Sequence, residues 1–167
     1  MYDELTEVDI KKMEEEIHYR ECILGPELLA EMKRTREFGD LSENAEYKEA
    51  KREKRKNEGR IRYLKNMIRT AKIIEVSDVS GVVGLFDRVK IYNESTKSEK
   101  SIQLVTTLRQ NALLGYVSKE SPLGSALMGH KVGDRVFVEV NERVSYYVVI
   151  KELEKGEDDD SLPISGY

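Results

Sequence analysis

Apolar residues recur at intervals of three and four positions through the first seventy or so residues. This period is that of one face of an α-helix, so the pattern predicts an outgoing helix over residues 6–38 and a returning helix over residues 42–72. The apolar positions expected on the outgoing helix are Ile10, Met13, Ile17, Leu24, Leu28 and Met32. Gly25-Pro26 interrupts this helix, because proline inside a helix removes a hydrogen bond but suits the first turn of a new one. We expect a kink or a restart there.

The returning helix carries a seam for an antiparallel partner. The seam positions are Asn57, Ile61, Leu64, Ile68 and Ala71, and towards the preceding turn they continue through Lys54, Ala50 and Tyr47. Because this continuation is more polar, we expect the helical hairpin to be firmest at the end away from the turn.

Beyond a boundary near Ser77 the pattern changes to period two, which is typical of strands. Residues 86–91 and 102–106 each predict a strand, and residues 136–150 predict a hairpin that turns at Asn141-Glu142. Ser121, Pro122 and Gly129 have the positions of an N-cap, a first helical residue and a terminating glycine, so a short helix lies between these strands. The predicted class is α+β: an antiparallel helical coiled-coil hairpin over residues 1–76, followed by a small antiparallel β domain with a short helix over residues 77–153.

Composition narrows the class of protein. The net charge is −4 and 36% of residues are charged, which suits a long solvent-exposed helical pair and argues against general coating of DNA. Cys22 is the single cysteine, and there is no apolar run that could span a membrane and no secretory pattern. We expect a cytoplasmic protein without a disulfide. Residues 154–167 are acidic and lack a periodic apolar face, so we expect a disordered tail.

The turn between the two predicted helices carries paired acids. Gly39-Asp40 signals a turn, and Asp40 and Glu43 follow at the end of the hairpin. Two carboxylates there could share Mg²⁺, which binds through one or two protein carboxylates. The same spacing also fits a capping box, with Asp40 as N-cap and Glu43 reaching back. Both interpretations can hold together.

Basic residues gather on one side of the returning helix, opposite the seam. Those nearest the turn are Lys48, Lys51, Arg52 and Arg55, while Glu46, Glu49 and Glu53 fall on the other flank. This segregation fits a phosphate-binding stripe. It also fits a solvated face with weak intrahelical ion pairs.

The turn and its flanks resemble the bacterial Gre transcript cleavage factors, nearest their GreA branch. The resemblance rests on GDLSENAEY at residues 39–47, with Arg34, Arg36 and Glu37 before it and Lys48, Ala50 and Arg52 after it. The stretch SPLGSALMGHKVGD at residues 121–134 is similar to the corresponding family segment. The resemblance implies that the second domain is FKBP-like and docks on a coiled coil of RNA polymerase through Ser121, Pro122 and Leu123. Without it, Ser121-Pro122 would be taken simply as a helix start.

The resemblance further implies a function. The hairpin would enter the secondary channel of RNA polymerase and stimulate cleavage of backtracked RNA. Asp40 and Glu43 would then be the catalytic acids, holding Mg²⁺ jointly with the polymerase, and the basic stripe would hold the RNA 3′ segment. The protein would be a monomeric cofactor of an enzyme rather than an enzyme. Two alternatives are a non-cleaving occupant of the channel and a prolyl isomerase or chaperone, which would need an aromatic-lined apolar pocket.

Overall fold

The computed structural model describes residues 3–37, 39, 44–76 and 79–165. The chain divides into two compact units. The helical unit is Ile10–Ala71, and the β unit joins Asp3–Asp9 to Lys72–Tyr167. In this division the helical unit ends at Ala71, and a short N-terminal segment belongs to the β unit. The two units are described separately below.

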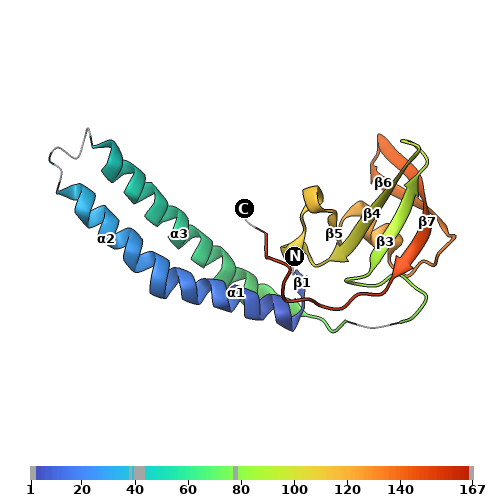
Figure 1. Cartoon of the computed structure of the whole chain (residues 1–167), viewed down its shortest axis with the longest axis horizontal. Coiled ribbons are helices and arrows are strands. Elements are labelled where there is room, and N and C mark those ends of the chain that lie inside the picture. Colours follow the sequence, from blue (N-terminus) through green and yellow to red (C-terminus); the bar gives the residue numbers. More distant parts are fainter. Residues whose placement is uncertain (1–2, 38, 40–43, 77–78, 166–167) are drawn as a thin grey trace. The chain divides into compact units, whose positions relative to one another are not determined.

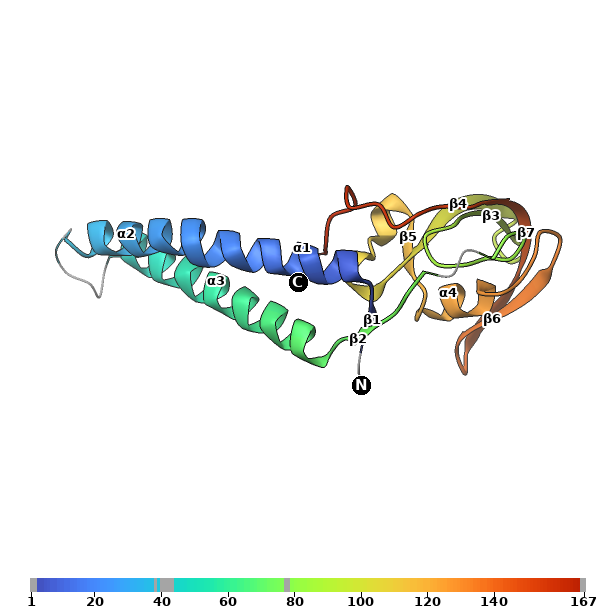
Figure 2. The same ribbon diagram turned by 90° about the horizontal axis from the view of Figure 1, so that it is seen from below.

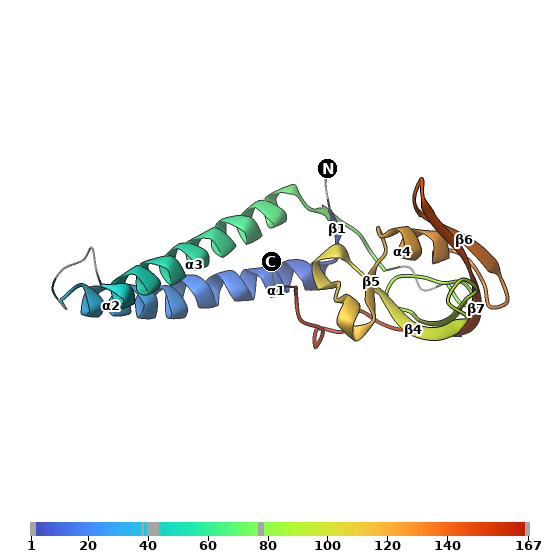
Figure 3. The ribbon, with the colours of Figure 1, turned by 90° about the horizontal axis from the view of Figure 1, so that it is seen from above.

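The helical unit is an antiparallel hairpin, which we call the arm (Figure 1). Its outgoing side consists of α1 (Glu7–Tyr19), a π-helical turn η1 (Arg20–Leu24) and α2 (Gly25–Arg36), and its returning side is α3 (Ala45–Thr70). Figures 2 and 3 show α3 next to α2 near the turn and diverging from α1 toward the other end of the arm. The predicted pair of helices is confirmed.

Burial along the arm confirms the predicted seam. Met13 and Leu64 are fully buried, and Ala50 and Asn57 are nearly so. The remaining predicted seam residues of both helices are half-buried, whereas the basic residues on the opposite side of α3 are exposed. The helices therefore pack through the period-3.5 stripe, and the stripe contains a polar residue, Asn57, at its middle.

The interruption at Gly25-Pro26 takes the form of the π-helical turn directly before it. The Gly25 N–H donates to the Arg20 carbonyl oxygen five residues back, and α-helical bonding resumes with Pro26 in the first turn of α2. A Cβ atom at position 25 would lie 2.8 Å from the Arg20 oxygen, so the glycine permits this wide turn. The π-helical bond spans one residue more than an α-helical bond does.

The β unit contains a five-stranded sheet with the order β5-β4-β3-β7-β6. Its strands are β3 (Arg88–Asn93), β4 (Ser98–Val105), β5 (Tyr116–Ser118), β6 (Arg135–Asn141) and β7 (Val144–Glu154). The predicted strands and the β6–β7 hairpin are confirmed. The sheet differs from the prediction in its bounds and in one pairing: β3 begins two residues later than expected, β4 begins four residues earlier, and β5 pairs with β4 in parallel. Three residues are too few to give a recognisable alternation.

Several short elements complete this unit. The parallel pair β1 (Glu4–Leu5) and β2 (Lys72–Ile73) joins its two chain segments. Two 3-10 turns, η2 (Thr107–Arg109) and η3 (Ala112–Leu114), precede β5, and helix α4 (Pro122–Leu127) follows it. Leu127 of α4 packs into the main apolar core, next to β6. The other buried members of this core are Val83, Val89, Ile91, Ile102, Leu104, Val136, Val138, Val148 and Ile150.

The tail is ordered where the structure describes it, so the expectation of disorder is wrong for residues 155–165. Leu162 is buried in a second apolar cluster with Phe86 and Val105. Arg109, fully buried, donates to the Asp158 carboxylate at 2.5 Å and to the Asp9 carboxylate at 2.5 Å. Asp158 of the tail and Asp9 therefore neutralise a buried cation within the same unit.

Candidate nucleic-acid interface and docking loop

The predicted tip acids, Asp40 and Glu43, lie outside the described residues. Nearby, α3 begins at Ala45, three residues later than predicted, and its N-cap is Asn44. The Asn44 Oδ1 atom accepts a hydrogen bond from the Tyr47 N–H at 3.0 Å. The interpretation of Asp40 as the N-cap of α3 is therefore wrong. Asparagine is among the best N-cap residues, so the signal for Asn44 was present in the sequence.

Asn44 also joins the two sides of the arm. Its Nδ2 atom donates to the Thr35 carbonyl oxygen of α2 at 2.6 Å. Thr35 is buried, and its own hydroxyl donates to the Glu31 carbonyl oxygen at 3.0 Å. Gly39, between the two helices, has φ +105°, a left-handed conformation that favours glycine. The end of α2 and the start of α3, which flank the acidic turn, thus carry three local features: a helix cap, a hydrogen bond between the two helices and a left-handed glycine.

The predicted basic stripe is a continuous exposed row on α3. Lys48, Lys51, Arg52 and Arg55 are spaced at i, i+3, i+4 and i+7, so they share one face, and together with Lys56 they line a shallow depression. The row begins four residues after the cap of the helix. Lys56 was not part of the sequence prediction.

The charges of the row are only partly compensated. Arg52 lies 3.5 Å from Glu49, and Lys56 lies 2.8 Å from Glu53 and lowers the pKa of that carboxyl through its hydrogen bond. Among the described residues, Lys48, Lys51 and Arg55 form no ion pair within 4.0 Å. The solvated ion-pair interpretation therefore accounts for the edge of the stripe, and three cations remain available for an external anion.

The predicted docking loop is first of all a helix start. Ser121 Oγ accepts from the Gly124 N–H at 3.0 Å and donates to the Ser118 carbonyl oxygen at 2.7 Å. Pro122 is exposed, whereas Leu123 is half-buried and packs against the apolar core of its own unit. Of the three predicted docking residues, Pro122 alone is exposed.

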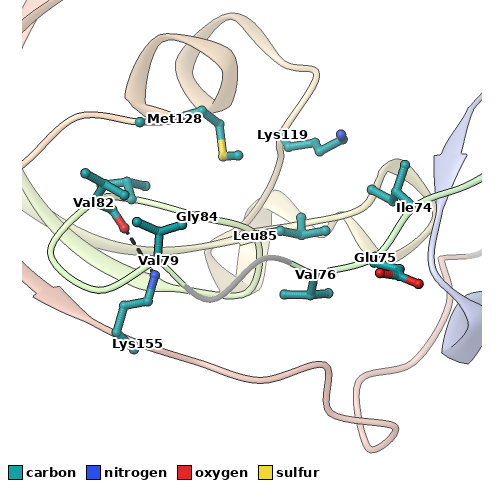
Figure 4. A pocket seen from close by; sticks show the side chains of 12 residues that line it. Ile74, Glu75, Val76, Val79, Val82, Gly84, Leu85, Lys119, Met128 and Lys155 are labelled. Carbon is teal, nitrogen blue, oxygen red and sulfur yellow. Dashed lines mark hydrogen bonds between the residues drawn. The ribbon is translucent and has the colours of Figure 1, made fainter.

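The β unit also has a pocket of about 370 Å³ (Figure 4). Lys155 reaches across one side of it to the Val82 carbonyl oxygen at 3.1 Å, and Met128 and Lys119 lie on the other side. Its described lining is aliphatic apart from Glu75, Met128 and the two lysines, with no aromatic residue among the described positions. This is not the aromatic lining that the isomerase alternative requires.

The described residues offer neither a further metal site nor a membrane-spanning helix. They contain no group of three or more histidine, cysteine or acidic side chains that could hold a metal ion. No helix among them is long and apolar enough to cross a membrane.

Comparison with known proteins gives the class. Residues 4–73 match the family model "Transcription elongation factor, N-terminal", and residues 77–155 match "Transcription elongation factor, GreA/GreB, C-term". The chain belongs to the GreA/GreB family of transcription elongation factors.

Individual relatives narrow this to the GreA branch. The chain is 42% identical over 137 residues to transcription elongation factor GreA of Thermoanaerobacter pseudethanolicus, covering 81% of this chain and 87% of that protein. It is 40% identical over 136 residues to GreA of Bacillus licheniformis, covering 81% and 86%. It is thus a GreA-type elongation factor of the transcript-cleavage class, and the isomerase and inhibitor alternatives are not favoured.

Solved structures include GreA factor homolog 1 of Thermus thermophilus, at 24% identity and a TM-score of 0.42, covering 93% of this chain and 100% of that one. A likeness of this degree carries no argument about the present chain.

Proposed function

We propose that this protein binds RNA polymerase, places the end of its arm in the secondary channel and stimulates cleavage of backtracked RNA there. Asp40 and Glu43 would be the acids that act at the reacting end. The observation that carries the proposal is the row of exposed, incompletely paired cations that begins on α3 directly after the Asn44 cap. It gives the arm a surface for an RNA phosphate chain close to its acidic turn.

The donor chemistry at the turn fits a shared magnesium ion. Asp40 and Glu43 supply carboxylate oxygens, which are the ligands that Mg²⁺ prefers. Two carboxylates are too few for a tight site, and the described residues add no cluster of acids. The metal would therefore be held only together with the polymerase. When bound, such an ion stabilises the charge on attacking and leaving oxygens.

The remaining parts of the chain position the reacting groups. The Asn44 bridge to Thr35 would hold together the two helices that flank the acids in the sequence. Lys48, Lys51, Arg52 and Arg55 would bind the RNA 3′ segment as it passes along α3. Pro122, supported by the Ser121 cap, would be the exposed contact with a coiled coil of the polymerase.

The test uses a stalled polymerase with end-labelled RNA and the double amide variant Asp40→Asn/Glu43→Gln. Amides keep the size and polarity of the side chains but remove the negative charge that a hard cation needs. We expect the variant to bind the polymerase and keep its helix content while stimulated cleavage falls steeply, with partial recovery at high Mg²⁺. Undiminished cleavage by the double variant would contradict the role of the acids.

A further inference from the structure

A polar layer crosses the middle of the arm, inside the otherwise apolar seam. Arg20 lies on the seam side of η1 and Asn57 is a seam residue of α3. Arg20 Nη1 donates to Asn57 Oδ1 at 3.1 Å, and Asn57 Nδ2 donates back to the Arg20 carbonyl oxygen at 3.1 Å. Two side chains and one backbone group are therefore paired reciprocally across the two helices.

The layer continues one turn along the arm through a shared carboxylate. Glu16 Oε1 accepts from Arg20 Nε at 2.7 Å and from Arg60 Nε at 2.8 Å, while Glu16 Oε2 accepts from Arg60 Nη2 at 3.2 Å. Both residues are buried: Arg60 is 6% exposed and Asn57 is 5% exposed. A displacement of one helix along the other would leave buried polar groups without partners, which is costly in a low-dielectric interior.

The apolar part of the seam does not favour one register of the two helices over another. Leucine, isoleucine and methionine pack in several registers at similar cost, whereas a buried asparagine at a seam position is the best-attested device for fixing one register. The π-helical turn strengthens the effect, because its carbonyl at Arg20 is the one that accepts from Asn57. The irregular turn and its partner thus specify each other.

We infer that Arg20 and Asn57 are positioning residues: they lock the register of the two sides of the arm and thereby set where the acidic turn stands. The expected effect of register on cleavage rests on the proposed function. A slip of one helical turn would move the chain by about 5.4 Å. A misplacement of 1 Å at a reacting centre can cost on the order of 100-fold in rate. Register is therefore a determinant of activity in its own right.

The test replaces both partners with leucine, in the variant Arg20→Leu/Asn57→Leu. Neither of the two side chains then remains as a buried polar group without the other. A purely structural role predicts that stability alone changes. Register is read from spin labels on Ala30→Cys and Ala45→Cys, both exposed, in a Cys22→Ser background. Thermal unfolding and transcript cleavage are measured on the unlabelled variant.

We expect the Leu/Leu variant to unfold at the same temperature as the parent or higher, since buried ionic groups are often replaced by apolar ones without loss. Its label-to-label distance should broaden or shift by several ångströms, and cleavage should fall at least tenfold. An unchanged single distance would overturn the inference, whether cleavage is kept or lost.

Two further variants keep the outcome decisive. Arg20→Lys alone keeps a cationic donor beside Asn57 and leaves the Asn57 bond to the backbone carbonyl of residue 20 in place, so it should keep a single distance even if the Leu/Leu variant fails to fold; a broad distance in this variant would count against the inference. Glu21→Ala/Lys65→Ala removes an exposed ion pair that also spans the two helices and should leave the distance unchanged. The distance measurement needs no polymerase, so a parent protein that fails to stimulate cleavage would refute the proposed function and leave register to be judged separately.

Discussion

Asn44 and Thr35 connect the two sides of the arm at its acidic end, with the Asn44 side-chain amide donating to the Thr35 carbonyl oxygen at 2.6 Å. One residue therefore caps α3 and closes the hairpin. Because both functions use different atoms of the same side chain, they can be separated by substitution.

Asn44→Ala removes both functions, and Asn44→Asp removes only the donor to Thr35. We expect Asn44→Ala to destabilise the arm by about 1–3 kcal/mol, from the loss of a cap and of a hydrogen bond. Asn44→Asp should cost less, since aspartate is an equally good cap. Hydrogen exchange of the first turn of α3 measures both effects, and exchange in Asn44→Asp equal to that of the parent would show that the Thr35 bond contributes nothing.

The basic stripe can be tested with Lys48→Glu/Lys51→Glu. If these cations bind RNA, cleavage of long backtracked RNA should fall more than that of short RNA, and the parent's advantage should shrink with added salt. The matched control is the same charge reversal at Lys33 and Arg69, exposed residues of the arm outside the stripe that form no ion pair among the described residues. Equal losses in both variants would indicate an effect of net charge rather than of the stripe.

The docking loop can be tested with a substitution that leaves the fold intact. Pro122→Ala keeps α4, because Ser121 supplies the cap, and we expect it to weaken polymerase binding several-fold with unchanged thermal unfolding. Ser121→Ala is the structural control, expected to cost about 1 kcal/mol of stability through loss of the cap. Binding by Pro122→Ala that matches the parent would remove this residue from the interface.

Glu16 should make the arm sensitive to acid. Burial alone would raise the pKa of its carboxyl, but hydrogen bonds and charge from Arg60 and Arg20 outweigh it and hold the pKa below 4.5. Such a group stabilises the fold at pH values above 4.5, and the contribution is lost as pH falls through the lowered pKa. We expect the stability gap between parent and Glu16→Gln to be constant near neutral pH and to close in acid, as followed by thermal unfolding. A gap that persists at low pH would exclude this linkage.

Arg109 is a fully buried cation of the β unit, and its loss would leave the buried Asp9 carboxylate with hydrogen bonds from Thr6 but without its counter-charge. Arg109→Met should therefore destabilise this unit by about 3–5 kcal/mol, as measured by denaturant unfolding. The double variant Arg109→Met/Asp9→Asn should recover part of that loss because it removes the orphaned charge. Additive losses in the double variant would show that the two side chains do not interact energetically.

Local patterns predicted much of this fold because their physical causes are local. The seam of the arm follows from helical period, and the Ser121 cap with Pro122 at the next position follows from helix-end chemistry. The start of α3 was misplaced because Asp40 and Asn44 are both good caps, and the contact that distinguishes Asn44 is the Thr35 carbonyl, nine residues away.

Other features depend on partners remote in the chain. The order of the tail depends on Arg109, 49 residues before Asp158, and no pattern within the tail indicates that cation. The polar layer of the arm likewise became visible only when Arg20 and Asn57 were seen to meet, 37 residues apart. Asp40 and Glu43 remain predictions from the sequence, because they lie outside the described residues.

The close approach of α4 to the strand before it restricts which sequences can encode this protein. A Cβ atom at Gly124 would lie 2.0 Å from the Ser118 carbonyl oxygen, and one at Gly156 would lie 2.0 Å from that of Phe86, backbone atoms that cannot move aside cheaply. At Gly129, by contrast, a Cβ atom would meet open space and only the φ of +79° disfavours a side chain. A saturation library selected for folded protein should therefore return glycine alone at positions 124 and 156, while asparagine should be recovered at 129.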